Sequence, residues 1–157
     1  MDPKDVLVSI KGVQSTEYSF PEVTELITTG QYSYGEKRSS LTYVDTETDS
    51  SHIPTNTVLH IEDGKVLLTR EGAVTYQILF EEGKRNFSLY QTDMGSMMVG
   101  VGVHRIHSRL DATGGELELD YSVEIDHAVA GENKFWIKIK DLSGGGTSYD
   151  TGSSLKS

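Results

Sequence analysis

The 157-residue chain contains no cysteine and no long apolar run. Without cysteine there is no disulfide framework, no thiolate metal site and no cysteine nucleophile. No stretch approaches the roughly 20 apolar residues of a membrane helix. The amino-terminal segment, MDPKDVLVSIKG, lacks the apolar run of a signal peptide, and the missing cysteines fit a reducing compartment. The sequence therefore predicts a cytoplasmic protein.

Basic residues are also scarce, since 14 lysines and arginines stand against 24 acids and give a formal net charge of −10. Contacts to phosphate need clustered Lys and Arg, so we expect neither nucleic acid nor an anionic membrane surface as a partner. An acidic chain could attract a cationic partner. A generic solvated surface is the simpler interpretation.

The clearest pattern in the chain is the alternation in residues 115–126, GELELDYSVEID. Its apolar side chains share one parity and its acids share the other, which predicts a strand with one buried face and one solvated face. Burial of each apolar side chain contributes about 1.5–3 kcal/mol, more than the strand aversion of Glu and Asp costs. We expect this strand to pair with residues 134–140, whose outward lysines would lie opposite its acids.

Alternation of this kind recurs almost from end to end, and no window shows a helical apolar period. Asp63-Gly64 separates two apolar runs and predicts a type I′ hairpin turn. Residues 131–133, Gly-Glu-Asn, are expected to form the turn before the last strand. About ten strands are predicted, over residues 6–11, 23–34, 39–44, 58–62, 65–70, 74–81, 84–92, 97–107, 115–126 and 134–140.

Short turns between so many strands favour an all-β fold, an up-and-down antiparallel β-barrel of about 8–10 strands, because closure removes the exposed sheet edges. A sandwich is the alternative architecture. We expect a single barrel domain over residues 1–140. Residues 141–157, rich in Gly and Ser, are expected to form a flexible tail.

Residues 97–107 depart from simple alternation. The apolar parity shifts near His104, which predicts a bulge or bend. Gly100 and Gly102 share one face of this strand and leave it without side chains. Curvature of the barrel wall explains the two glycines most simply. Close approach of a ligand is the alternative, and it makes Gly100, Gly102 and His104 candidate ligand-binding residues.

Arg70 is a second candidate ligand-binding residue. It shares a parity with Val66 and Leu68, so it points inward near the barrel mouth if those two face the core. A charge there must be paired with a carboxylate such as Glu71 or Glu81, or it binds an anionic group. Tyr90 and Thr92 would add hydroxyls beside Arg70 if their face lines the barrel. The sequence leaves open which face of residues 84–107 points inward.

Other side-chain combinations do not indicate catalysis, a cofactor or a metal site. His104 and His107 lie three apart, so on a regular strand they point to opposite faces. Asp45, Glu47 and Asp49 alternate as in a calcium loop, but the glycine and the final glutamate of that loop are missing. No nucleophile, base and orienting group come together, so an enzyme is the least favoured class.

Several segments resemble the YwiB-like family of bacterial proteins. They are R-E-G-A at residues 70–73, F-E-E-G-K-R at 80–85, Y-Q-T-D-M-G at 90–95, DVLVSIKG near the start and GGELELDYSVEI later. The likeness spans roughly residues 5–140. It departs from the family at Asp93-Met94, where we would expect Pro-Tyr. The resemblance implies a calycin-like or lipocalin-like barrel and no particular activity. Members of that wider fold often bind small molecules inside, which is a fold-level analogy.

Two functions remain in view. The first is a non-enzymatic barrel that binds a small amphipathic or anionic ligand in its lumen. The second is a structural or protein-interaction barrel with a core filled by side chains. In that case Trp136 would be an anchor on an exposed wall, and a homodimer is the accompanying hypothesis.

Overall fold

The computed structural model describes residues 3–16, 19–45, 54–72, 75–92 and 95–142. These residues form ten strands: β1 (Lys4–Thr16), β2 (Ser19–Ser33), β3 (Ser39–Asp45), β4 (Thr55–Glu62), β5 (Lys65–Glu71), β6 (Tyr76–Glu81), β7 (Arg85–Thr92), β8 (Gly95–Asp111), β9 (Gly114–Ile125) and β10 (Ala128–Asp141). In the described part of the chain, no helix is long and apolar enough to cross a membrane. Residues 143–157, most of the predicted tail, lie outside the described residues, as does most of the acidic loop with Glu47 and Asp49.

All ten strands belong to one antiparallel sheet with the order β6-β5-β4-β3-β2-β1-β10-β9-β8-β7. Consecutive strands therefore pair with each other, with one exception, and the first strand also pairs with the last. One pair of consecutive strands, β6 and β7, is joined by no ladder of backbone hydrogen bonds within the described residues. The result is the predicted up-and-down barrel, closed except for a seam between β6 and β7.

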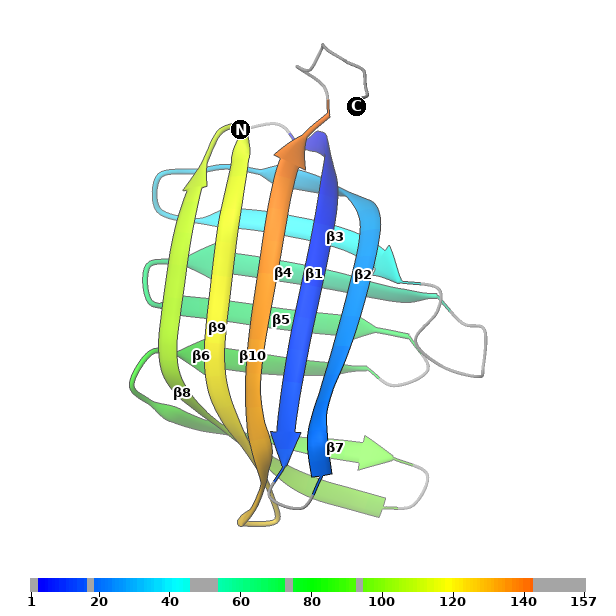
Figure 1. Cartoon of the computed structure of the whole chain (residues 1–157), viewed down its shortest axis with the longest axis vertical. Helices are drawn as coiled ribbons and strands as arrows, with labels where there is room; N and C mark the ends of the chain where they lie inside the picture. The colour runs from blue at the N-terminus through cyan, green and yellow to red at the C-terminus, as the bar shows by residue number, and fades with distance from the viewer. Residues whose placement is uncertain (1–2, 17–18, 46–53, 73–74, 93–94, 143–157) are drawn as a thin grey trace.

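The barrel is flattened into two layers that cross each other (Figure 1). In the front layer β8, β9, β10, β1 and β2 run along the long axis of the view, while β3 to β6 run across behind them. β2 and β8 bend from one layer into the other and so form two corners, as strands do in orthogonal packing. In β8 the bend coincides with a register shift between Val103 and Arg105. His104 is the extra residue, which confirms the predicted bulge.

The core lies between the two layers and consists of alternate residues from nearly every strand. The front layer contributes Val6, Val8, Leu117, Leu119, Ile137 and Ile139, and the rear layer contributes Leu41, Leu59, Ile61, Val66 and Phe80. All are at most 5% exposed. The parity predicted for residues 115–126 is therefore confirmed at Leu117 and Leu119. Near the end of the strand the predicted exposure fails, because Ile125 is 39% exposed while Glu124 of the acidic face is buried.

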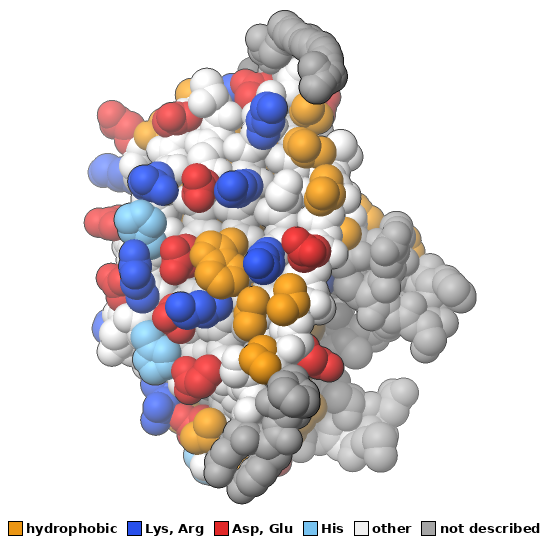
Figure 2. Space-filling model, viewed as in Figure 1, with side chains coloured by type: hydrophobic (Ala, Val, Ile, Leu, Met, Phe, Trp, Pro, Cys, Tyr) orange, Lys and Arg blue, Asp and Glu red, His pale blue; other side chains and the backbone are white. Residues whose placement is uncertain are grey.

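The acids of β9 form a ladder with the lysines of β10 on the outer wall. Lys134 lies opposite Asp120, and Lys138 lies opposite Glu116. This confirms the predicted pairing of the two strands. Figure 2 shows the acidic and basic side chains interspersed over this face.

Two turns differ from the sequence prediction. At Asp63-Gly64 the glycine has a positive φ of 70° and Asp63 does not, so the turn is not type I′. The turn with positive φ at both central positions is Asp126-His127, at 49° and 71°. β10 consequently begins at Ala128, and Gly131 lies at a register shift inside the strand, not in a turn.

Candidate ligand-binding site

Arg70 faces the interior of the barrel, as its parity with Val66 and Leu68 predicts. It is the cross-strand neighbour of Thr57 on β4 and of Tyr76 on β6, so the three side chains share one row and one face. Thr57 is fully buried, which identifies the face as the inner one. Arg70 Nε donates to Thr57 Oγ1 at 3.2 Å, and Nη1 donates to the Tyr76 hydroxyl at 3.1 Å.

Tyr76 in turn stacks on Tyr90 of β7. Their ring centroids are 4.7 Å apart with an interplanar angle of 28°. Burial raises the pKa of Tyr90 far above its usual value, and the neighbouring phenols of Tyr76 and Tyr121 add to that shift. The charge of Arg70 acts on Tyr90 in the opposite direction. The structure thus brings two of the predicted residues, Arg70 and Tyr90, to one place.

Tyr121 of β9 reaches the same region from the other layer. Its ring packs edge-on against Phe80, with centroids 4.9 Å apart. The pKa of Tyr121 is raised to about 12, mainly by burial and also by the neighbouring Tyr76, while the guanidinium of Arg70 opposes the shift. The raised pKa values of Tyr90 and Tyr121 keep both phenols protonated near neutral pH, so both are hydrogen-bond donors near the cationic Arg70. Such a cluster can bind an anionic group, and it offers no general base.

A pocket of about 160 Å³ opens beside Tyr121 at this end of the barrel. Its inward-facing lining comes from Gly12, Thr24, Tyr121, Asn133 and Phe135, on four neighbouring strands. A Cβ at Gly12 would lie 3.1 Å from Thr24 Oγ1 and 3.5 Å from the Phe135 ring. The missing side chain at Gly12 therefore helps to keep this space open.

Sequence reasoning did not find several of these residues. Thr57, Tyr76, Gly12 and Asn133 come from four strands, and no spacing within the chain links them to Arg70. The parity of residues 115–126 did place Tyr121 on the inner face. For Thr57 and Tyr76 the missing information was the register of β4 and β6 against β5.

Gly100 and Gly102 do not line this site. They lie on the outer face of β8, because Val99, Val101 and Val103 occupy the inner face. A Cβ at Gly100 would meet the Phe87 ring at 2.8 Å, and one at Gly102 would meet Ser122 Oγ at 3.1 Å. The spaces left by both glycines are thus taken up by neighbouring side chains on the outside of the barrel.

His104 also stands apart from the Arg70 cluster. The bulge turns His104 outward, where its exposed ring lies 3.1 Å from Glu132 Oε1. Thr92 pairs through its backbone with Gly95, and its side chain is outside the described atoms. Glu81, a predicted partner of Arg70, lies near Lys65 and Lys84 instead, at 3.8 and 3.7 Å.

The fold and this site define a β-barrel with a polar cluster at one open end. Comparison with protein families gives a match to the family described as "Domain of unknown function (DUF1934)" over residues 8–137, so the chain belongs to that family. It is 28% identical over 104 residues to the "Uncharacterized beta-barrel protein YwiB" of Bacillus subtilis (strain 168), covering 66% of this chain and 71% of the relative. This confirms the YwiB-like resemblance.

The fold matches the crystal structure of the ywiB protein from Bacillus subtilis. The TM-score is 0.76 at 22% sequence identity, and the match covers 88% of this chain and 92% of that one. At this identity the likeness shows the fold alone. Any binding activity has to be argued from the residues of this chain.

Proposed function

We propose that the open end of the barrel binds a small amphipathic ligand that carries an anionic group. Arg70 would bind the anion through its guanidinium, and Tyr76, Tyr90 and Tyr121 would form an aromatic wall with hydroxyls at hand. The observation that carries the proposal is the position of Arg70, on the inner face of the wall and held there by Thr57 and Tyr76.

The size of the adjoining pocket supports a small ligand. Its volume of about 160 Å³ exceeds the share of one water molecule, about 30 Å³, and is below the roughly 300–1,000 Å³ of sites for drug-sized molecules. A ligand of that size, or one end of a longer molecule, would contact Phe135 and Tyr121 while its anionic group reaches toward Arg70.

The up-and-down meander is the arrangement of lipocalin-like barrels, whose open end is their ligand entrance. That analogy supports the location of the site and not the identity of the ligand. We place the function in the cytoplasm, because a chain without cysteine fits a reducing compartment.

A structural barrel without a ligand is the second candidate. It is favoured by the 18 buried apolar side chains of the core among the described residues, which fill much of the space between the layers. The two candidates differ in what they predict for the pocket beside Tyr121. A structural barrel does not require an open, partly polar space beside Tyr121.

A fluorescence titration with anilinonaphthalene sulfonate, an aromatic anion, tests the proposal. Arg70→Gln removes the charge from the inner face of the barrel wall, and the matched control Arg109→Gln removes the same charge from the outer wall, where its side chain is 71% exposed. We expect Arg70→Gln to weaken binding about tenfold or more, the effect of a lost charge-assisted hydrogen bond, and Arg109→Gln to leave it unchanged.

A second variant separates the pocket from the charge. Thr24→Phe places a ring into the pocket from an exposed position, so the core is left intact, and we expect it also to weaken binding. Equal affinity in the wild type and in both pocket variants would assign the dye to another surface and refute the proposal. A wild type that binds neither the dye nor any copurifying compound seen by native mass spectrometry would favour the structural barrel.

A further inference from the structure

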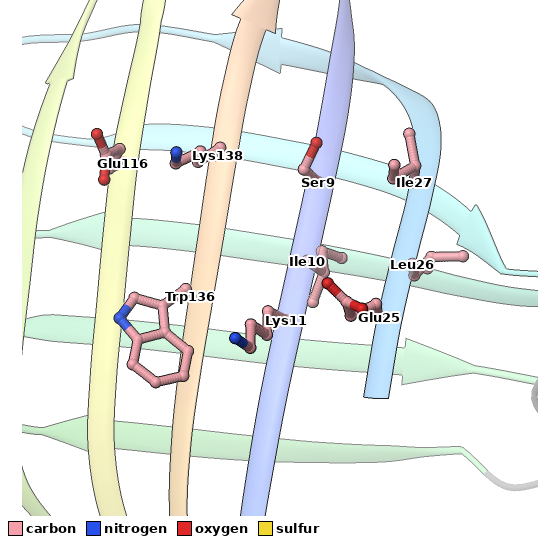
Figure 3. A pocket seen from close by; sticks show the side chains of 9 residues that line it. All are labelled: Ser9, Ile10, Lys11, Glu25, Leu26, Ile27, Glu116, Trp136 and Lys138. Atoms are coloured by element: carbon pink, nitrogen blue, oxygen red, sulfur yellow. The ribbon is translucent and has the colours of Figure 1, made fainter. Parts of the chain in front are cut away.

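The outer wall of β1, β2 and β10 carries exposed apolar side chains where a barrel wall is ordinarily polar. Ile27 is 71% exposed and Val23 is 55% exposed, with Val13 and Trp136 half-buried beside them. A groove of about 560 Å³ runs along this wall and is lined by Ile27, Trp136, Lys11, Glu25 and Lys138 among others. Figure 3 shows these side chains on neighbouring strands. Exposed apolar side chains interspersed with charged ones in a groove mark a candidate interaction site.

The edge of the same wall is open. β2 pairs with β3 only over Gly30–Ser33, so residues 19–29 have β1 on one side and, in the described part of the chain, no strand on the other. An unpaired strand edge beside an apolar groove invites association with another chain.

The charges on this wall have a pattern that fits a second copy. Lys11 and Glu25 are cross-strand neighbours, and so are Val13 and Val23. No ion pair joins Lys11 to Glu25 among the described side chains; Lys11 Nζ lies 5.8 Å over the Trp136 ring instead. Both charges are therefore available to a partner that presents the opposite charge at the same spacing.

We propose that two copies of the chain dock face to face through this wall. The two-fold axis lies between the two walls, runs parallel to the strands and passes over the line midway between β1 and β2. It places each β1 residue of one copy over the β2 residue of the other copy that is its equivalent cross-strand neighbour. Lys11 then faces Glu25 of the second copy, and Val13 faces Val23 of the second copy. Each contact occurs twice, as an isologous interface requires.

The same symmetry places Trp136 within the interface. β10 lies one strand further from the axis than β1, so Trp136 extends beyond β2 of the second copy and covers its open edge. An aromatic anchor surrounded by charged residues is typical of the residues that dominate binding. The dimer thus accounts for the apolar groove, the unpaired edge and the unused charges together.

Sedimentation velocity over a range of protein concentrations tests this proposal through charge reversal. Lys11→Glu places two acids opposite each other on both sides of the axis, and Glu25→Lys does the same with two bases. We expect each variant to raise the dimer dissociation constant about tenfold or more. The double variant Lys11→Glu with Glu25→Lys restores the complementary charges, so we expect its dissociation constant to return close to that of the wild type.

Lys37→Glu, at an exposed position in the turn between β2 and β3, is the control and should leave the dimer unchanged. The dimer is overturned if the wild type sediments as a monomer at about 100 µM, or forms a stable complex only with a different protein. It is also overturned if the double variant is no tighter than the single variants, because only the reciprocal pairing makes the two changes compensate. Circular dichroism and the melting temperature confirm that each variant is folded.

Discussion

Tyr76 and Tyr90 stack across the seam where the barrel lacks a backbone ladder. Their rings, 4.7 Å apart at the centroids, link β6 to β7 and hold the inner row that contains Arg70. Further along the seam the contacts are also made by side chains. Asn86 Nδ2 donates to the carbonyl oxygen of Leu79 at 3.2 Å, and Ser88 Oγ donates to that of Gln77 at 3.3 Å.

Asn86→Ala should therefore destabilise the barrel more than the size of the side chain suggests. The substitution removes the bond to Leu79 and a second one to Glu81 Oε1 at 3.3 Å. We expect a loss of about 1–2 kcal/mol in the free energy of unfolding, measured by urea denaturation. Ser108→Ala, at an exposed position on β8, is the matched control and should cost little. Equal stability of the two variants would show that the hydrogen bonds of Asn86 contribute little to holding the seam.

Gly114 and Gly64 should respond very differently to the same substitution. Both have positive φ, 122° and 70°. A Cβ at Gly114 would collide with the carbonyl oxygen of Ile139, whereas no atom lies within 4 Å of one at Gly64. We expect Gly114→Ala to cost about 3 kcal/mol or more and Gly64→Ala about 1 kcal/mol, from strain alone. Urea denaturation of both variants measures the difference, and similar costs would contradict the close approach of β9 to β10.

Alkaline pH should weaken the fold through Tyr32. Burial raises the pKa of this phenol from 10.0 to about 12, an effect opposed by a hydrogen bond with Ser39 and reinforced by the charge of Asp111. The folded state thus favours the protonated form, so its stabilising contribution is complete below about pH 10 and is lost as the pH rises toward about 12. We expect the free energy of unfolding to fall above about pH 10.

The variant Tyr32→Phe separates this effect from other alkaline changes. It removes the hydrogen bond that the hydroxyl donates to the carbonyl oxygen of Asp111 at 2.7 Å, so it lowers stability near neutral pH. It should also make the alkaline decline shallower than in the wild type, without abolishing it, because Tyr121 titrates in the same direction. An unchanged slope would assign the decline to groups other than Tyr32.

His127→Gly should stabilise the protein. His127 has a φ of 71°, a conformation that costs a side-chain-bearing residue about 1–2 kcal/mol and costs glycine little. Greater freedom of the unfolded chain and loss of the ring contact with Phe87, at 5.9 Å, offset part of the gain. We expect a net gain of up to about 1 kcal/mol. Asp63→Gly, in a turn where the replaced residue has a negative φ, should destabilise instead.

The sequence predicts well whatever depends on alternation within one strand. Leu117 and Leu119 are inward because five apolar residues share one parity, and Lys138 lies opposite Glu116 because both strands have an outward charged face. The inward direction of Arg70 follows from the same rule. The number of strands, their antiparallel order and the bulge at His104 were accessible in this way.

What the sequence could not predict depends on relations between strands. β8 has valines on one face and glycines on the other, so either face could have been the lining; the structure shows that Phe87 covers Gly100 from outside. The turn at Asp126-His127 was missed because neither residue is glycine, and its geometry is stabilised by a hydrogen bond from Asp126 N to the carbonyl oxygen of Met98. Predicting the cluster around Arg70 would require the registers of β4, β5 and β6 against one another, which no pattern within a single strand provides.

The pairing of β1 with β10 makes the chain suited to circular permutation. Val6 lies opposite Asp141, so the two ends of the barrel chain could be linked by a short connection. Opening the chain at Glu82-Gly83, beside the seam, would then yield a sequence whose strands follow one another in the order of the sheet, from β7 through β10 and β1 to β6. The seam would become the place where the permuted chain starts and stops, and no strand ladder would be interrupted.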